Sequence, residues 1–193
     1  APGHSDHTNA GRTFIGELNG ADSGRIRQLN DLLTGAGFDV SVAEDIESVI
    51  WSKFVLNCAV NPVSAMTGLR TGEIGASEPA RAFQQAILEE VLEVVQARGI
   101  SLGDTDPRAT VEGFTGRLFN RPSMLQHMDA GLATEIDSLN GAVVREGQRL
   151  GVDTPFNQAL TLLVKARNAQ LIQALHGPPI DYQALEASGQ ADT

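Results

Sequence analysis

The sequence predicts a mainly α-helical protein that opens with a short β-α-β segment. Three observations support this fold class. Apolar residues recur at helical spacing in five segments after residue 45. Two short stretches near the N-terminus instead have the composition and alternation of strands, and they flank a single helical stretch. No convincing strand pattern follows residue 45. We therefore expect residues 45–193 to form an α-helical domain.

The N-terminal segment carries the strand signals. Residues 12–17, RTFIGE, lie between glycines and predict a strand. Ser23 is a candidate N-cap for the helix that follows. Its apolar residues at helical spacing are Ile26, Leu29, Leu32 and Leu33. Apolar residues at 38, 40 and 42 then predict a second strand with one buried face. About 30 residues are too few for a free-standing domain, so we expect residues 1–44 to be the end of a larger α/β domain.

Five helices are expected after this segment, because capping or breaking residues bound each periodic stretch. Their expected ranges are 45–66, 77–99, 106–118, 123–150 and 154–177. Gly131 marks a candidate break in the fourth, whose expected inward residues are Leu132, Ile136, Leu139 and Val143. The fifth opens at Thr154-Pro155 and carries the apolar residues Phe156, Leu160, Leu163 and Val164. The polar residues 184–193 are expected to lack regular structure.

Composition narrows the function classes. The chain has 14 basic and 24 acidic residues, and its net charge is −10. Such a charge repels phosphate backbones, which argues against nucleic-acid binding. No apolar stretch approaches the roughly 20 residues of a membrane span. One cysteine and four histidines form no clustered ligand set, so no metal is expected. These features favour a soluble protein in the cytoplasm.

The first long helix carries a polar stripe. Lys53, Asn57 and Asn61 are spaced by four residues, so they lie within about 80° of arc on one helix face. The positions around them are mostly apolar. Pro62 lacks a backbone N–H and predicts a kink that frees backbone polar groups at the end of the stripe. A lysine with two amides suits recognition of an anionic small molecule, in which Lys53 donates a proton to a carbonyl oxygen.

Spacing alone leaves a structural interpretation of the stripe open. A lysine can extend from a buried helix toward water, and two amides can serve helix–helix hydrogen bonds. A second cluster, RPSMLQHMDAGLATEIDSLNG, is equally ambiguous. Ser123 stands at an expected helix start, where it is either a plain N-cap or part of a carboxylate site. Glu135 and Asp137 either bind a ribose hydroxyl or a cation, or lie on a solvated helix face.

Taken together, these motifs resemble one family. The stretches TFIGE, IWSKFVLNCAVNP, SMLQ, ATEIDSLNG and GVDTPFN occur in the order found in ketopantoate reductases (2-dehydropantoate 2-reductases), and they extend over nearly all of residues 12–170. The resemblance implies a C-terminal helical domain similar to that of 6-phosphogluconate dehydrogenase. It also implies that residues 1–44 are a short remnant of an N-terminal Rossmann domain, with the active site in the cleft between the two domains.

The resemblance further implies an activity and residue roles. Ketopantoate reductases use NADPH to reduce 2-dehydropantoate, a 2-keto acid, to (R)-pantoate in pantothenate and coenzyme A biosynthesis. Lys53 matches the lysine that protonates the ketone oxygen, and Asn57 and Asn61 match asparagines that hold the substrate. The loop that binds the substrate carboxylate and hydroxyl matches Ser123, Met124, Leu125 and Gln126. Glu135 matches the glutamate on the cofactor side of the site.

Two departures from the family pattern bear on this assignment. The family often has Ser-Ser-Met-Leu-Gln-Asp, whereas this chain has Pro122 before Ser123 and His127 after Gln126. In addition, the dinucleotide fingerprint Gly-x-Gly-x-x-Gly occurs nowhere in the 193 residues. We therefore expect the chain to be part of a longer protein and to be inactive alone.

Two alternatives to a ketopantoate reductase follow from these departures. His127 and Pro122 favour a paralogous reductase of another 2-keto or β-keto acid. The missing fingerprint favours a non-catalytic helical interaction module. A homodimer is also expected, because a helical domain separated from its neighbour leaves apolar surface to cover.

Overall fold

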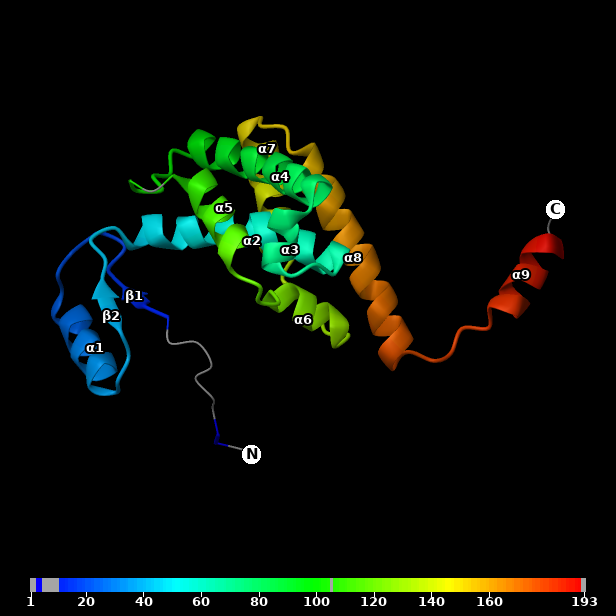
Figure 1. Ribbon diagram of the computed structural model, residues 1–193, viewed down its shortest axis with the longest axis horizontal. Coiled ribbons are helices and arrows are strands. Elements are labelled where there is room, and N and C mark those ends of the chain that lie inside the picture. Colours follow the sequence, from blue (N-terminus) through cyan, green and yellow to red (C-terminus); the bar gives the residue numbers. More distant parts are fainter. Residues whose placement is uncertain (1–2, 5–10, 105, 192–193) are drawn as a thin grey trace.

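The chain is built almost entirely of helices, as its periodicity predicts (Figure 1). The computed structural model describes residues 3–4, 11–104 and 106–191. Two short strands, β1 (Thr13–Ile15) and β2 (Val40–Val42), flank helix α1 (Gly24–Gly35). The remaining helices are α2 (Ile46–Thr67), α3 (Thr71–Ala76), α4 (Glu78–Ala97), α5 (Pro107–Arg117), α6 (Ser123–Asp129), α7 (Asn140–Leu150), α8 (Pro155–His176) and α9 (Tyr182–Ala191). None of these helices is long and apolar enough to cross a membrane.

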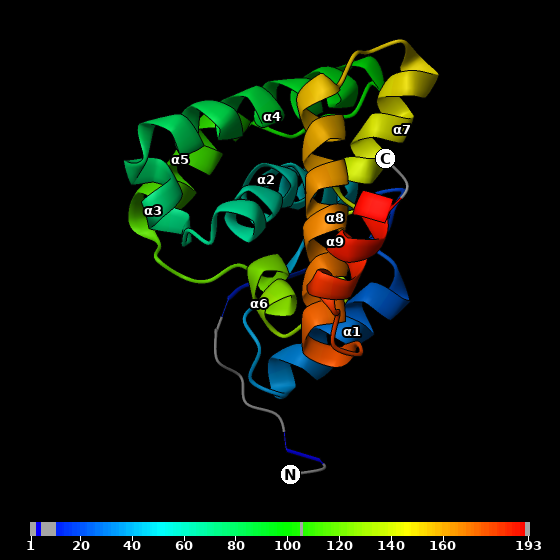
Figure 2. The same cartoon turned by 90° about the vertical axis from the view of Figure 1, so that its right-hand side faces the viewer.

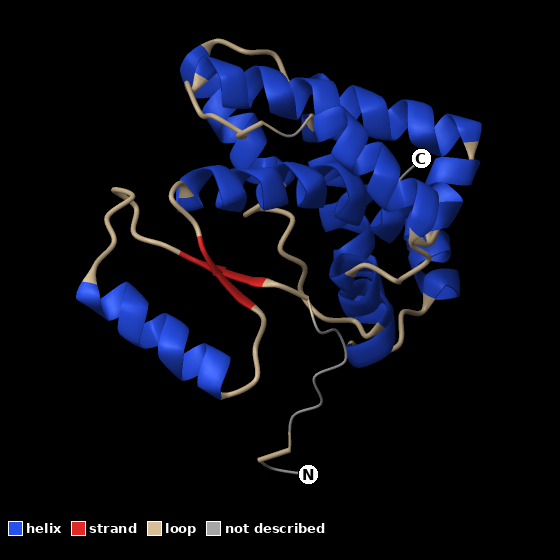
Figure 3. Cartoon of the chain, turned by 60° about the vertical axis from the view of Figure 1, so that its left-hand side comes forward, coloured by secondary structure: helices blue, strands red, loops and turns tan. Residues whose placement is uncertain are grey.

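The N-terminal β-α-β segment is confirmed. Strands β1 and β2 pair in parallel, with Thr13 opposite Val40 and Ile15 opposite Val42 (Figure 3). Ser23 caps α1 by accepting a hydrogen bond from the Ile26 backbone N–H. The apolar residues of α1 are only partly buried. Ile26 is buried, but the side chain of Leu32 is 69% exposed, because only two strands cover this helix.

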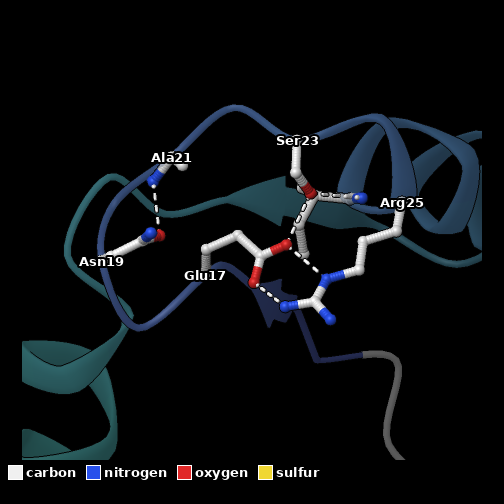
Figure 4. A network of polar contacts seen from close by, with 6 residues as sticks. Glu17, Asn19, Ala21, Ser23 and Arg25 are labelled. Carbon is white, nitrogen blue, oxygen red and sulfur yellow. Dashed lines mark hydrogen bonds and ion pairs between the residues drawn. The ribbon is translucent and has the colours of Figure 1, made fainter.

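A charged network closes the turn between β1 and α1 (Figure 4). The Glu17 carboxylate accepts hydrogen bonds from Ser23 Oγ and Arg25 Nε, both at 2.5 Å, and it also pairs with Arg25 Nη2. These hydrogen bonds, first from Arg25 and then from Ser23, lower the pKa of Glu17 to about 2. The side chain that caps α1 is therefore itself held by an acidic residue two positions after the end of β1.

Helix α2 lies at the centre of the helical body. Its N-cap is Asp45, and it ends at Gly68 with a φ of +74°. It packs against α4, α5, α6 and α8, which surround it in Figure 2. All residues from Cys58 to Ala65 are buried, whereas the N-terminal half of the helix reaches toward the strands. One helix thus connects the β-α-β segment to the core.

Pro62 lies inside α2 and leaves one carbonyl free, as expected. Helix α2 nevertheless continues through Pro62 to Thr67. A proline at this position cannot donate to the carbonyl four residues earlier, which belongs to Cys58. The side chain of Asn140, at the start of α7, supplies the missing donor, with its Nδ2 at 3.1 Å from the Cys58 carbonyl oxygen. A buried amide therefore completes the hydrogen bonding of the central helix.

Asn140 belongs to a larger buried network at the start of α8. Its Nδ2 also donates to Asn157 Oδ1 at 2.8 Å. Asn157 Nδ2 in turn donates to Glu90 Oε2 at 2.7 Å. The two carboxylate oxygens of Glu90 also accept the backbone N–H groups of Phe156 and Asn157, each at 2.8 Å. A carboxylate from α4 thus caps the N-terminus of α8, where negative charge is favourable.

The expected fourth helix is divided into two helices, and the candidate break at Gly131 is confirmed. Residues 130–139 between α6 and α7 are not helical, and Gly131 adopts a φ of +63° that breaks the helix. Consequently the side chain of Leu132 is 53% exposed instead of inward. Ile136, Leu139 and Val143 are buried as expected.

Three further differences concern short or amphipathic segments. Helix α3 has only six residues, too few for periodicity to show, and Glu73 closes its first turn by accepting from the Arg70 backbone N–H. On α8, Leu160 and Val164 are buried, whereas Phe156 and Leu163 are exposed. The tail expected to be irregular contains α9, which stands away from the helical body in Figure 1. Residues 192–193 lie outside the described residues.

Candidate functional site

A pocket of about 230 Å³ lies between α2, α5 and the connection that leads into α6. Its wall contains every residue of the polar stripe and also Ser123. The lining residues are Lys53, Leu56, Asn57, Val60, Asn61, Phe114, Asn120, Arg121, Pro122 and Ser123. The tertiary structure therefore brings together two motifs that are far apart in the sequence.

The stripe runs from the surface into the protein. Lys53 is exposed, Asn57 is half-buried and Asn61 is only 8% exposed. Helical spacing places them on one side of α2, and the slope of α2 into the core sets their different depths. Leu56, Val60 and Phe114 supply the apolar part of the wall. The pocket therefore offers a cation at its mouth and an amide at its inner end.

The stripe side chains are not engaged by the protein. Within residues 3–4, 11–104 and 106–191, no hydrogen bond or ion pair is formed by the side chains of Lys53, Asn57 or Asn61. Most buried side-chain amides have a partner, because an unpaired one costs about 1–3 kcal/mol. The hydrogen-bonding capacity of these three side chains is thus available to a ligand in the pocket.

Ser123 connects the pocket to two further polar residues. Its Oγ donates to Glu135 Oε1 at 3.3 Å, and His127 Nδ1 lies 3.3 Å from Glu135 Oε2. Glu135 comes from the non-helical residues 130–139, whereas Ser123 and His127 belong to α6. The two clusters that the sequence singles out, the stripe and the residues from 123 to 135, are therefore in contact at Ser123.

The other residues of the SMLQ stretch do not line the pocket. Met124 and Leu125 are 0% and 5% exposed, and both pack in the core. Gln126 is exposed, and its Nε2 donates to the Arg121 backbone oxygen at 2.8 Å. The backbone N–H groups in the first turn of a helix have no partner within the helix. Any contribution of Met124 and Leu125 to binding would therefore come from their backbone.

Sequence reasoning missed Asn120 and Arg121, which complete the pocket wall. Both directly precede the PSMLQ stretch, and that proximity was the available signal. The Arg121 guanidinium pairs with the Asp129 carboxylate. Lys53 and Arg121 are the charged residues among those that line the pocket, and both are cations. A pocket of this charge in an acidic protein favours an anionic ligand.

The start of α3 fixes the connection that carries Asn120. Thr71 Oγ1 donates to the Leu118 carbonyl and lies 3.1 Å from Asn120 Oδ1. Arg70 Nη1 donates to the Phe119 backbone oxygen at 3.2 Å. A Cβ on Gly72 would lie 2.6 Å from the Phe119 ring, so this close approach requires glycine. The short helix that the sequence did not reveal therefore supports one wall of the pocket.

The turn after β1 does not fit the phosphates of a dinucleotide cofactor. Such phosphates bind at a glycine-rich turn that opens a helix. Here Ser23 occupies the start of α1, and the Glu17 carboxylate adds negative charge there. A Cβ on Gly16 would lie 2.7 Å from the Ala43 carbonyl oxygen, so this glycine serves packing of the backbone. The described residues of this turn therefore offer no phosphate cradle.

Comparison with known proteins agrees with the geometry. A relative from Archaeoglobus fulgidus named 2-dehydropantoate 2-reductase is 32% identical, covering 84% of this chain and 55% of its own. A relative of the same name from Mesorhizobium japonicum is 35% identical, covering 86% of this chain and 50% of its own.

Solved structures show the same fold. A PanE/ApbA family ketopantoate reductase from Ralstonia eutropha JMP134 matches with a TM-score of 0.77 and 29% identity, over 86% of this chain and 54% of that one. A D-mandelate dehydrogenase solved with NADH and anilino(oxo)acetate matches with a TM-score of 0.75 and 26% identity, over 83% and 67%.

The family to which the chain belongs is shown by a match over its helical residues. The chain spans about half the length of the curated relatives it matches. The family described as "Ketopantoate reductase PanE/ApbA C terminal" matches residues 45–168, which hold the stripe, Ser123 and Glu135. The chain therefore belongs to the ketopantoate reductase family, through the C-terminal helical region of that family.

Proposed function

We propose that this chain forms the substrate-binding part of a reductase that converts 2-dehydropantoate to (R)-pantoate, a step of pantothenate and coenzyme A biosynthesis. The observation that carries the proposal is the pocket in which Lys53, Asn57, Asn61 and Ser123 meet. The names of the curated relatives support the same substrate.

The proposed roles follow from the depth of each residue. Lys53 donates a proton to the ketone oxygen, and its positive charge stabilises the oxyanion that develops in the transition state. Asn57 and Asn61 hydrogen-bond the substrate oxygens deeper in the pocket. Ser123 and the backbone N–H groups of Met124 and Leu125, with Gln126 beside them, face the polar end of the substrate. Arg121 adds positive charge that favours a carboxylate.

A nicotinamide cofactor would supply the hydride. The resemblance of the motifs to the family favours NADPH, whereas the D-mandelate dehydrogenase structure contains NADH. Because the turn after β1 does not fit the phosphates, we propose that they bind to a nucleotide-binding part outside these 193 residues. Residues 1–44 would then be the end of that Rossmann-type domain, and residues 45–193 the helical domain. Glu135, beside Ser123, would lie on the cofactor side of the pocket.

The test is kinetic and uses a longer polypeptide in which a nucleotide-binding part precedes this chain. NADPH oxidation is followed with 2-dehydropantoate as substrate, and NADH is compared. Saturable turnover with 2-dehydropantoate supports the proposal, and the 193 residues alone should show none. A longer protein that binds NADPH but leaves 2-dehydropantoate unchanged would contradict it.

A second candidate substrate class has specific support. The similarity to D-mandelate dehydrogenase, together with the apolar wall of Leu56, Val60 and Phe114, favours a 2-keto acid with a larger apolar side chain. A substrate panel that includes benzoylformate and 2-ketoisovalerate separates this paralogue from a ketopantoate reductase. Failure with every 2-keto acid would favour the non-catalytic interaction module.

We also propose that the chain forms a homodimer through α8. Leu162, Leu163 and Leu175 on this helix are more than half exposed. Exposed apolar side chains that cluster on one element favour association. Light scattering should give twice the monomer mass, and the double change Leu162→Glu and Leu163→Glu should reduce it to the monomer mass. An unchanged mass in that variant would exclude this surface.

A further inference from the structure

One carboxylate in the candidate site is shared by two side chains of the same helix. Glu135 Oε1 accepts from Ser123 Oγ, and Glu135 Oε2 lies against His127 Nδ1, both at 3.3 Å. Ser123 and His127 are four residues apart on α6, so they face the same side of that helix. The two oxygens of Glu135 therefore span one turn of α6.

The segment that presents Glu135 is held from the other side by α8. Asn168, which is only 7% exposed, accepts the Thr134 backbone N–H at 3.2 Å and donates to the Leu132 carbonyl at 2.8 Å. This buried amide therefore holds the backbone immediately before Glu135. The backbone carbonyl of Glu135 also accepts the N–H groups of Ser138 and Leu139, at 2.9 and 3.1 Å, so the turn is held after Glu135 as well as before it.

His127 reaches the pocket only through this carboxylate. Ser123 lines the pocket, whereas neither Glu135 nor His127 is part of its lining in the described structure. With Glu135 held at one oxygen by His127, its other oxygen is directed at the Ser123 hydroxyl. The orientation of that hydroxyl, and therefore what Ser123 presents to a ligand, depends on where Glu135 lies.

We propose that His127 is a positioning residue of the pocket, which holds Glu135 against Ser123 while Asn168 anchors the segment that carries Glu135. The proposal rests on the proposed function, since the pocket is taken as the substrate site. A histidine ring N–H can donate to Glu135, which the aspartate often found at this place in the family pattern cannot do. An aspartate here would instead place two carboxylates side by side, and like charges repel.

The variants that test the proposal differ in whether residue 127 can donate a hydrogen bond to Glu135. His127→Gln keeps a hydrogen-bond donor, His127→Leu removes it, and His127→Asp introduces the repulsion. In the longer polypeptide with 2-dehydropantoate, we expect kcat/KM to fall about tenfold in the leucine variant, the size of one lost hydrogen bond. Most of that loss should lie in KM, because Ser123 holds substrate. The glutamine variant should stay within about threefold of native, and the aspartate variant should fall at least as far as the leucine variant.

A second measurement does not depend on turnover. Hydrogen exchange of residues 130–139 is followed in the 193-residue chain, with Asn168→Ala as the anchor variant and Arg167→Ala as its exposed neighbouring control. Exchange should be faster by about tenfold or more in Asn168→Ala and His127→Leu, and close to native in Arg167→Ala and His127→Gln.

The outcomes separate the two proposals. If the native longer protein ignores 2-dehydropantoate but the exchange pattern is as expected, the proposed function fails and the positioning role stands. If the leucine and glutamine variants match native in both exchange and kinetics, the positioning role is overturned. It is also overturned if His127→Asp is as active as native, or if leucine and glutamine lose activity equally together with thermal stability.

Discussion

Two pairs of asparagines, one on α2 and one in the core, differ in whether their side chains have hydrogen-bond partners within the protein. Asn57 and Asn61 point from α2 into the pocket, and their side chains have no partner among the described residues. Asn140 and Asn157 lie in the core at 0% exposure. Asn140 Nδ2 donates to the Cys58 carbonyl and to Asn157 Oδ1, and Asn157 Nδ2 donates to the Ile87 carbonyl and to Glu90.

The difference shows that the hydrogen-bond partners of a buried amide indicate whether its role is structural or ligand-binding. In the core, the amides satisfy groups that the fold leaves open, namely the Cys58 carbonyl freed by Pro62 and the buried Glu90 carboxylate that caps α8. Among the side-chain nitrogen and oxygen atoms of Asn140 and Asn157, only Asn140 Oδ1 has no hydrogen-bond partner in the described structure. In the pocket the fold leaves both amides open, which stabilises nothing in the free chain. Open hydrogen-bonding capacity beside a cation therefore marks the ligand site.

The largest expected effect is on stability in the core pair. Asn157→Ala removes the Nδ2 donor from Glu90 and from the Ile87 carbonyl, and the acceptor of Asn140. Since these groups remain buried, the free energy of unfolding should fall by about 3 kcal/mol. Urea unfolding of the 193-residue chain measures it. Asn57→Ala is the matched control and should change the value by less than about 1 kcal/mol; equal losses at both positions would abolish the distinction between the pairs.

The next effect is on catalysis at the pocket mouth. Lys53→Ala in the longer polypeptide should lower kcat with 2-dehydropantoate about 10²-fold or more, because a proton donor is lost. The chain contains one other lysine, Lys165, whose exposed pair with Asp137 makes Lys165→Ala a natural control. Thermal unfolding should be similar in both variants. A Lys53→Ala enzyme that keeps native kcat would remove Lys53 from the chemistry.

Replacing Asn61 by leucine should affect stability and substrate binding in opposite directions, which sharpens the comparison between the two asparagine pairs. Asn61 is 8% exposed and unpartnered in the part of the chain described, so Asn61→Leu should keep or slightly raise the unfolding midpoint. The same change should raise KM about tenfold, since a substrate hydrogen bond is lost. The comparison variant is Asn157→Leu, which should lower the midpoint. Destabilisation by Asn61→Leu would show that Asn61 has a structural role instead.

The smallest expected effect is on the pH dependence of stability, and it concerns the Glu17 carboxylate, which belongs to neither asparagine network. Hydrogen bonds from Arg25 and Ser23 lower the pKa of Glu17 from 4.5 to about 2. A lowered pKa in the folded state stabilises the chain above about pH 4.5, and this stabilisation is lost as the pH falls from 4.5 to about 2. Glu17→Gln should therefore melt at a lower temperature than native at pH 7, and the gap should close by about pH 2. Parallel melting curves across that range would contradict the expectation.

Much of the helical frame could be predicted from local sequence. Caps and breakers such as Ser23, Asp45, Pro107 and Gly177 act within one turn, so they set boundaries close to those observed. Gly131 indicated a break in the helix expected across residues 123–150, but the length of the break was not predicted, because the Asn168 anchor lies 37 residues later in the chain. Helix α3 was missed since six residues carry too little periodicity.

The sequence by itself determined that Lys53, Asn57 and Asn61 share one face, because helical geometry follows from their spacing alone. It also determined the family resemblance and the free carbonyl opposite Pro62. Only the tertiary structure decided that Ser123, Asn120 and Arg121 complete the pocket, and that Asn140 and Asn157 serve the core. The physical reason is that a hydrogen-bond partner is a neighbour in space, and the partners of Asn140 and Asn157 include residues 17 to 82 positions away in sequence.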